Sequence, residues 1–451
     1  SFKSIKLYNN INNNNVKKYI HYYTNPVDIN VENMDMKISP TGMFPIRKYK
    51  HIVDLINKNI NNKNINNNIN NANLFSIASL ATVEDLNVSH SLEYINHFIN
   101  GTINIKDMKR IGFPWSNSFV NRCRGSAGAT IEAMHHVCKY NAVHTSDIKP
   151  NTKPNTSSSN NDTATNSTSS NNDTTINSTN TDTNNTMNTK YKTIEHSNTI
   201  TCHIGGGTHH AFHDHGEGYC VFNDIVIASD IALQQYKHIG LNKILIIDLD
   251  VHQGNGTAKM CRNRHNRNNN KNSDSESESD IFTFSMHCEG NYFSTRQYSD
   301  IDVEIQNQCN DIEYLDLLEK WLCWLIPHVK PDLIFYQAGV DIHQNDRLGK
   351  LNITMDGVNK RNMLVYNSII NYNKQVEINM NTADKSEKSD QKSSKSDQNP
   401  ANLVDIDHYC RLVVTMGGGY PKNLQENSKA FQDVIQLHSN VYTDAYNAFC
   451  V

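Results

Sequence analysis

The segment ILIIDLDVHQGNGTA, residues 244–258, constrains the fold more than any other part of the sequence. It opens with the apolar run ILII and then places Asp248, Asp250 and His252 two residues apart. Continuous apolar runs of this kind are typical of parallel strands that are buried on both faces of a sheet. A buried strand that ends in two carboxylates and an imidazole indicates that these polar groups have partners at the end of the strand.

Three further apolar runs have the same character: IFTFSMH at 281–287, DLIFYQAG at 332–339 and RLVVTMGGG at 411–419. Helical patterns lie between such runs. Residues 223–238 form one, with Asn223 as a candidate N-cap, and residues 311–329 form another. In the second, the apolar spacing uses Ile312, Leu315, Leu318, Leu322 and Leu325. The alternation predicts an α/β fold with a doubly wound, mostly parallel sheet flanked by helices.

Four low-complexity blocks interrupt this pattern, at about 57–73, 145–195, 262–280 and 377–402. They consist mostly of Asn, Ser, Thr and charged residues, which cannot bury enough apolar surface to offset the entropy of ordering them. Long surface insertions cost a domain little, because closure entropy grows slowly with loop length. We therefore expect a single catalytic domain over residues 1–451 with disordered insertions.

Composition narrows the location and the partners. The net charge of −4 argues against direct nucleic-acid binding, and no apolar stretch is long enough to predict a membrane span. The ten cysteines include no C-x-x-C pair, which favours free thiols in a reducing compartment. The first residues show no apolar region of a signal peptide. A nuclear or cytoplasmic protein is therefore expected.

Polar residues at the strand ends predict a metal site. In an open parallel sheet, ligands bind beyond the carboxyl ends of the strands. Asp250 and His252 follow one predicted strand, and Asp341 follows another. Three such ligands suit a catalytic zinc ion, which keeps a further position for water and substrate. Imidazole and carboxylate also accept Fe²⁺, so the sequence leaves Zn²⁺ and Fe²⁺ open.

Further candidates for catalysis surround these ligands. The segment GGGTHHAF places His209 and His210 side by side, and two imidazoles can divide acid and base roles beside an activated water. Asp248 and Asn255 are the candidates to orient them. Tyr420, which ends MGGGY, is a candidate donor to a developing oxyanion. The set predicts hydrolysis of an unactivated carbonyl compound such as an amide.

These residues, with the motifs around them, resemble the histone deacetylase superfamily, most closely its class IV and bacterial deacetylase-like members. The resemblance covers most of the chain outside the low-complexity blocks and rests on motifs in one order. They are FPIRKY (44–49), RIGFPWS (110–116), GGGTHHAFHDHGEGYCVFND (205–224), DLDVHQGNGTA (248–258), FTFSMH (282–287), FYQAGVDIHQNDRLGKLNIT (335–354) and MGGGY (416–420). FPIRKY, VHQGNGTA and DRLGKL favour the class IV side.

The resemblance implies an arginase/deacetylase-like fold and a role for each matching residue. It implies zinc ligands at Asp250, His252 and Asp341, a histidine dyad at His209 and His210, and a transition-state tyrosine at Tyr420. Asp248 matches the carboxylate behind the first histidine, and Asn255 stands where some relatives have Asp behind the second. It also implies a structural K⁺ site at Asp248, Asp250, His252, Ser285 and Met286, and an acyl-lysine tunnel lined by Gly218 and Tyr219 with Tyr292 or Phe293 opposite.

The predicted function is a zinc-dependent hydrolase that removes acetyl or longer acyl groups from lysine side chains of proteins such as histones, in chromatin regulation. The class IV resemblance implies a preference for long fatty acyl groups. A first alternative is an acetylpolyamine or other small-amide deacetylase, for which Glu217 and Glu289 are the candidate acidic groups. A second is a catalytically silent scaffold that binds acyl-lysine. An arginase-type activity would need a second metal ion and more carboxylates than these motifs supply.

Overall fold

The computed structural model describes residues 20–29, 44–64, 75–145, 200–268, 280–390 and 409–450 of the chain. Within them, eight strands form one sheet in the order β2-β1-β3-β8-β7-β4-β5-β6, and each neighbouring pair is parallel. The strands are β1 (His21–Thr24), β2 (Phe75–Ile77), β3 (Ile200–Ile204), β4 (Ile244–Asp248), β5 (Ile281–Cys288), β6 (Ile301–Ile305), β7 (Leu333–Gln337) and β8 (Arg411–Thr415). The predicted α/β class is confirmed.

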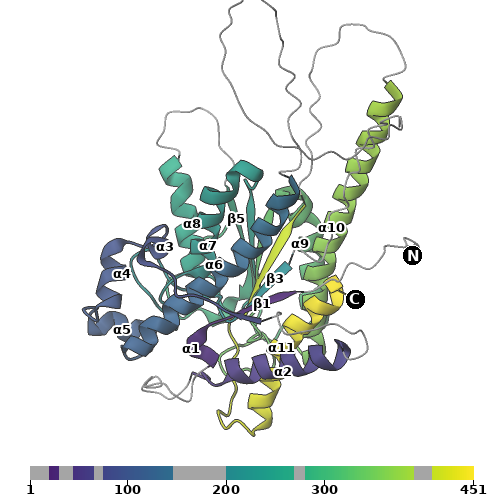
Figure 1. Cartoon of the computed structure of the whole chain (residues 1–451). Coiled ribbons are helices and arrows are strands. Elements are labelled where there is room, and N and C mark those ends of the chain that lie inside the picture. The colour runs from purple at the N-terminus through teal and green to yellow at the C-terminus, as the bar shows by residue number, and fades with distance from the viewer. Residues whose placement is uncertain are drawn as a thin grey trace, which may run out of the picture.

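Helices cover both faces of the sheet (Figure 1). One layer contains α6 (Asn117–Thr145), α7 (Asp224–Tyr236) and α8 (Asn255–Asn268). The other contains α2 (Lys48–Asn64), α9 (Asp311–Val329), α10 (Met355–Asp390) and α11 (Lys429–Cys450). The short helices are α1 (Pro26–Ile29), α3 (Val83–Asn87), α4 (Leu92–Ile99) and α5 (Ile105–Ile111), with 3₁₀ turns η4 (Lys237–Ile239) and η5 (Glu289–Asn291).

The two predicted helices form, with one difference in the buried face. Asn223 caps α7, and its side-chain oxygen accepts a hydrogen bond from the Val226 amide at 3.2 Å. Helix α9 has the predicted bounds, but Ile312 is 81% exposed. The buried face of α9 contains Tyr314, Leu318, Leu322, Leu325, Ile326 and Val329. Ile312 projects away from this face because it lies about 200° around the helix from Tyr314.

Helices also extend into three of the four low-complexity blocks. Helix α2 continues to Asn64, α8 to Asn268 and α10 to Asp390, where the sequence predicts insertions without regular structure. The remaining parts of the blocks, at 65–73, 146–195, 269–279 and 391–402, lie outside the described residues. Among the helices of the described ranges, none has the length and apolarity needed to cross a membrane.

A buried arginine ties together the loops that follow β4 and β7. The guanidinium of Arg361, on α10, is fully buried and donates to the carbonyl oxygens of Leu249, Ala338 and Gly339. These carbonyls adjoin Asp250 and the loop that leads to Asp341. Because buried carbonyl groups need donors, Arg361 holds the two loops at a fixed separation.

A buried lysine supports the loop that follows β8. Lys48, the first residue of α2, is 1% exposed and donates from Nζ to the Gly419 carbonyl at 2.9 Å. Nζ also lies 3.4 Å from His438 Nε2 and 5.5 Å from the centre of the Tyr420 ring. Burial lowers the pKa of Lys48 to about 8, although the charges of Asp346 and Asp341 oppose this change.

Replacing Arg361 should destabilise the fold. In Arg361→Met, three buried carbonyl groups lose a donor, and each such loss costs about 1–3 kcal/mol. We expect the free energy of unfolding, measured by urea denaturation, to fall by about 3 kcal/mol or more. Arg47→Met is the control, because Arg47 is an exposed partner of Glu426 and its loss should cost less than about 1 kcal/mol. Equal stability of the two variants would contradict this interpretation.

Lys48 should make stability depend on alkaline pH. Its pKa is about 8 in the folded chain against 10.5 for an ordinary lysine, so between these values the unfolded chain binds the extra proton. Relative to Lys48→Met, the free energy of unfolding of the native chain should therefore rise by about 3 kcal/mol from pH 8 to pH 10.5. Urea denaturation at several pH values measures it. Parallel pH profiles for the two proteins would contradict the assignment.

Candidate active site

The sequence-predicted site residues gather at the carboxyl ends of four strands that are neighbours in the sheet, β3, β8, β7 and β4. The histidine pair follows β3, Asp248 ends β4, Asp341 follows β7, and Tyr420 follows β8. These strands are far apart in sequence but adjacent in the fold. After β3 the chain forms β4, β5 and β6 first, and β7 and β8 are then inserted between β3 and β4. The loops after all four strands therefore meet at one edge of the sheet.

Asp250, His252 and Asp341 form a cluster that fits a metal ion. One ligand atom from each lies within 4.8 Å of the others. His252 Nδ1 is 3.2 Å from Asp250 Oδ1 and 3.2 Å from Asp341 Oδ2. Backbone amides hold the other oxygens: Gly418 donates to Asp250 Oδ2 at 2.7 Å and Val251 to Asp341 Oδ1 at 3.0 Å. Asp341 Oδ2 is buried without a hydrogen-bond donor, and a cation would satisfy it.

The charges of this cluster perturb one another strongly. Burial opposes charge on His252, but the two nearby carboxylates of Asp250 and Asp341 outweigh it and raise the pKa of His252 to about 10. Burial and the neighbouring Asp250 raise the pKa of Asp341 to about 7. For Asp250, the effect of burial is outweighed by His209 and His252, which hold its pKa well below the usual value. Without a cation, a protonated His252 therefore offsets the two carboxylates, and a divalent cation would take the place of that proton.

Glycines let the loops approach the carboxylates closely. A Cβ on Gly418 would lie 2.0 Å from Asp341 Oδ2, and a Cβ on Gly339 would lie 2.2 Å from Asp250 Oδ2. Both separations are far below van der Waals contact, so these positions accept no side chain. Gly418 of MGGGY and Gly339 therefore allow the loops after β8 and β7 to pack against the two carboxylates.

The adjacent histidines have different partners. His209 Nδ1 lies 2.7 Å from Asp248 Oδ2, and His210 Nδ1 lies 2.8 Å from Asn255 Oδ1. Burial opposes charge on His209, but Asp248 outweighs it and raises the pKa of His209. Burial and the nearby His209 and His252 lower the pKa of His210 well below its ordinary value. The rings are 4.0 Å apart, so a charge on one disfavours a charge on the other.

Asp224 fixes the loop that carries the histidines. Its carboxylate accepts hydrogen bonds from the backbone amides of Gly207 at 3.1 Å and Thr208 at 2.8 Å. Thr130, on α6, donates a further hydrogen bond to it at 2.5 Å. Asp224 is the first residue of α7, so the carboxylate also lies at the favourable end of the helix dipole.

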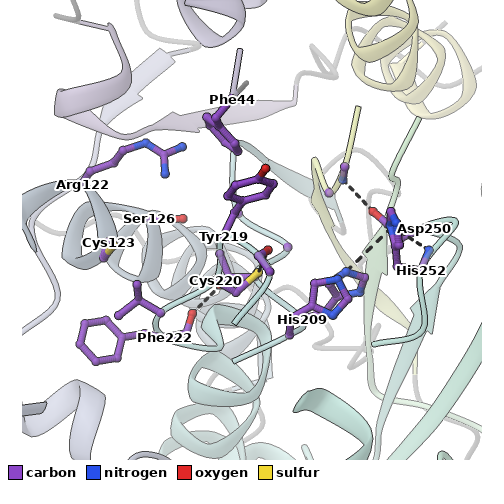
Figure 2. A pocket seen from close by; sticks show the side chains of 18 of the residues that line it. Phe44, Arg122, Cys123, Ser126, His209, Tyr219, Cys220, Phe222, Asp250 and His252 are labelled. Atoms are coloured by element: carbon purple, nitrogen blue, oxygen red, sulfur yellow. Dashed lines mark hydrogen bonds and ion pairs between the residues drawn. The ribbon is translucent and has the colours of Figure 1, made fainter. Parts of the chain in front are cut away.

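Figure 2 shows His209, Asp250 and His252 in one pocket. Tyr420 lines the same pocket. Its backbone amide donates to Asp346 Oδ2 at 2.6 Å. Burial and the charges of Asp341 and Asp250 raise the pKa of Tyr420 well above its ordinary value. The hydroxyl therefore keeps its proton and acts as a hydrogen-bond donor. The pocket continues past the cluster toward α6, where Arg122, Cys123 and Ser126 line it.

The predicted tunnel residues separate into two groups. Gly218 and Phe293 adjoin His210: a Cβ on Gly218 would lie 2.8 Å from the Phe293 ring, and that ring lies 4.7 Å from the His210 ring. Tyr219 packs between Phe44 and Tyr420, at 5.2 and 5.9 Å between ring centres (Figure 2).

Tyr292 does not join this wall. Its hydroxyl lies 2.6 Å from His287 Nε2, and the guanidinium of Arg296 covers its ring at 4.1 Å. Of the two residues that the sequence left open, the structure therefore brings Phe293 and not Tyr292 to the histidines.

The residues of the predicted K⁺ site lie on β4 and β5 and in the loop after β4. Asp248 and Ser285 are register partners on these strands, and Met286 is the next residue of β5. Ser285 Oγ lies 2.9 Å from His287 Nδ1. The structure thus brings the named residues together behind the metal cluster, and the K⁺ site stays a prediction.

Sequence reasoning missed residues that act on the site from a distance. Lys48, Arg361 and Asp224 hold its loops. The sequence suggests Glu217 only as an acidic group for a polyamine substrate and does not predict its contact with Asn255 at 2.6 Å. Lys48, Asp224 and Glu217 fall inside quoted motifs, where each has an apolar, aromatic or glycine residue on at least one side. That context was the available signal, because isolated charges in buried segments need partners.

Comparison with known proteins identifies the family. The chain matches the family described as Histone deacetylase domain over residues 43–378, a range that holds every candidate site residue except Tyr420. It is 33% identical to an uncharacterized protein of Picosynechococcus over 286 residues. The aligned segment covers 63% of this chain and 70% of that protein.

Two further relatives match over shorter ranges. Histone deacetylase 2 of Arabidopsis thaliana is 30% identical over 166 residues, which is 36% of this chain and 38% of the relative. The acetoin utilization protein AcuC of Staphylococcus aureus is 31% identical over 166 residues, 34% of this chain and 38% of the relative. The chain thus spans well under half of these two proteins. Since the family match runs from the loop before α2 into α10 and includes the whole metal cluster, the chain belongs to the histone deacetylase domain family.

Proposed function

We propose that this protein is a metal-dependent hydrolase that removes acetyl or longer acyl groups from lysine side chains of proteins such as histones. The observation that carries the proposal is the convergence, in one pocket, of Asp250, His252 and the histidine pair with Tyr420. Asp341 completes the cluster with a buried oxygen that lacks a donor. Zinc is the proposed metal and Fe²⁺ the alternative, since both accept two carboxylates and one imidazole.

The side chains of the pocket supply the proton transfers. When bound, the cation would polarise the substrate carbonyl and lower the pKa of a water molecule. His210, held by a neutral amide, accepts the proton of the attacking water at its free ring nitrogen. His209, held by the Asp248 carboxylate, is stabilised as an imidazolium and can donate to the leaving amine. Tyr420 donates a hydrogen bond to the oxygen on which negative charge develops.

The walls of the pocket support an acylated lysine as the substrate. Phe293 is 54% exposed and packs over His210, so an apolar chain can run along its ring toward the cluster. On the far side, Tyr219 and Phe44 give the pocket an aromatic wall. A methylene chain ending in an amide fits such a lining, because burying it needs few polar partners. The FPIRKY, VHQGNGTA and DRLGKL motifs support the class IV branch, and with it a nuclear or cytoplasmic location.

The acidic groups near the site do not favour a polyamine substrate. Glu217 is 4% exposed, and its two oxygens accept hydrogen bonds from Asn255 and Ser294. Glu289 accepts a hydrogen bond from Gln306. Both oxygens of Glu217 are therefore engaged, and Glu289 is not among the residues that line the pocket. A silent scaffold is likewise less well supported, because such a protein has no use for a buried acid pair beside two oriented imidazoles.

Asp341 should be required for metal binding. Asp341→Asn removes the negative charge and keeps the shape, so we expect the affinity for Zn²⁺ to fall by about 100-fold or more. Metal content after dialysis against a weak chelator measures this. Asp332→Asn is the matched control. Asp332 is a buried carboxylate at the opposite end of β7, where it accepts hydrogen bonds from the backbone amides of residues 242 and 243. Equal metal content in both variants would contradict the assigned site.

The zinc- or iron-loaded full chain should hydrolyse acyl-lysine peptides, and a strong chelator should stop it. A series from acetyl to long fatty acyl groups, with acetylpolyamines alongside, measures the substrate preference. Tyr420→Phe should lower kcat by about 100-fold or more, because one oxyanion donor is lost. Tyr298→Phe is the control, since Tyr298 is 65% exposed and outside the pocket. Absence of turnover on every peptide under both metals would reject the proposed function, and faster turnover of acetylpolyamines would favour the small-amide alternative.

A further inference from the structure

A chain of three polar side chains extends from His210 into the protein. His210 Nδ1 lies 2.8 Å from Asn255 Oδ1, and Asn255 Nδ2 donates to Glu217 Oε1 at 2.6 Å. Ser294 Oγ donates to the other oxygen, Glu217 Oε2, at 2.9 Å. Asn255 and Glu217 are each 4% exposed. A buried carboxylate without a cationic partner in this chain of contacts costs free energy, which calls for a functional reason.

The carboxylate fixes the direction of every hydrogen bond in the chain. An ionised Glu217 only accepts, so Asn255 must turn its NH₂ group toward it. The backbone amide of Gly256 donates to Asn255 Oδ1 at 3.0 Å, which favours the same orientation of the amide. Asn255 Oδ1 therefore faces His210 and accepts a hydrogen bond from its Nδ1–H group. His210 must carry its hydrogen on Nδ1, and in the neutral ring Nε2 is then the acceptor.

We propose that Glu217 is a positioning residue that acts through Asn255 to hold His210 in the Nδ1-protonated tautomer, with Nε2 free to accept a proton. The proposal rests on the role given to His210 in the proposed function. It assigns to Glu217 no contact with the substrate, in keeping with its burial and with the engagement of both its oxygens.

Asn255 separates the carboxylate of Glu217 from the ring of His210, and this separation has a physical reason. His209 contacts the carboxylate of Asp248 directly, and such contact stabilises an imidazolium. With the rings 4.0 Å apart, a second direct carboxylate would favour a second charge beside the first. Asn255 transmits the orientation imposed by Glu217 without placing a full negative charge on His210. Asp248 and Asn255, which lie seven residues apart in the chain, thereby favour different protonation states in the two neighbouring histidines.

The test exchanges the amide of Asn255 and the carboxylate of Glu217, which together form a relay to His210. Glu217→Gln lets the facing amides reverse, so His210 can lose the Nδ1-protonated form, and kcat on an acyl-lysine peptide should fall by about 10-fold. Asn255→Asp sets two carboxylates against each other at 2.6 Å and should lower kcat by about 100-fold. In the double variant N255D/E217Q the amide and the acid are exchanged, so the amide at position 217 can donate a hydrogen bond to the carboxylate at position 255. Its kcat should exceed that of N255D but stay below the native value, because the carboxylate at position 255 then contacts His210 directly, and KM should change less than about twofold.

The matched control is Glu132→Gln. Glu132, on α6, accepts a hydrogen bond from the Ser79 amide and lies outside the pocket, so its substitution should leave kcat unchanged. Metal content and thermal unfolding of each variant separate loss of the relay from loss of the metal or the fold. A double variant no more active than N255D would overturn the proposal.

A second measurement leaves Asn255 and Glu217 unchanged and does not depend on catalytic activity. In the metal-loaded native chain, ¹⁵N-histidine NMR should show His210 protonated at Nδ1, with its resonances assigned by their loss in His210→Gln. A proton on Nε2 would overturn the proposal even if the enzyme is active. If no acyl-lysine peptide is hydrolysed but the Nδ1 proton is found, the relay stands and the proposed function fails, so the two failures are distinguishable.

Discussion

The burial of Asp250 and Asp341 side by side is the constraint on which the rest of the site depends. Each is at most 1% exposed, and two negative charges in a medium of low polarity repel strongly. His252 lies 3.2 Å from both carboxylates, and backbone amides of Gly418 and Val251 hold one oxygen of each. The chain therefore surrounds the acid pair with donors and positive charge, yet leaves Asp341 Oδ2 without a donor. That arrangement is stable when a cation completes it.

The same need for positive charge extends beyond the cluster. Arg361 binds the carbonyls after β4 and β7, and Lys48 binds the carbonyl of Gly419 beside Tyr420. Both cations come from the helix layer of α2 and α10, so that layer supports the site from behind while α6 and α7 support the histidine loop. Burying Lys48 costs stability, as its lowered pKa indicates. The fold accepts this cost where it fixes the loop that carries Tyr420.

The sequence predicted the parts of the fold that depend on local pattern. The four apolar runs became β4, β5, β7 and β8, and the capping of α7 by Asn223 formed as expected. The convergence of Asp250, His252 and Asp341 followed from one topological rule, since carboxyl ends of parallel strands meet at one edge. The apolar spacing of α9 was less reliable, because Ile312 satisfies helical spacing to Leu315 but lies away from the buried face. Periodicity alone does not show which of two apolar stripes is covered.

Contacts between distant segments could not be predicted in this way. Nothing local indicates that Lys48 meets Gly419, separated by 371 residues, or that Arg361 meets Leu249, separated by 112. The choice between Tyr292 and Phe293 likewise depends on His287 and Arg296, which draw the tyrosine away from the pocket. The helical continuations of α2, α8 and α10 into polar blocks depend on helices that begin in the core and propagate outward, which composition does not reveal.

The segment 244–258 supplies two of the three proposed metal ligands and the different partners of the two histidines. Asp250 and His252 belong to it, and so do Asp248 and Asn255, the separate partners of His209 and His210. Both rings could not be charged at 4.0 Å in a buried pocket, so their partners have to differ. The end of β4 provides the carboxylate and the first residue of α8 provides the amide. A single strand-loop-helix unit thus carries two of the three proposed metal ligands and gives two adjacent imidazoles different partners, because all of these groups share one short backbone.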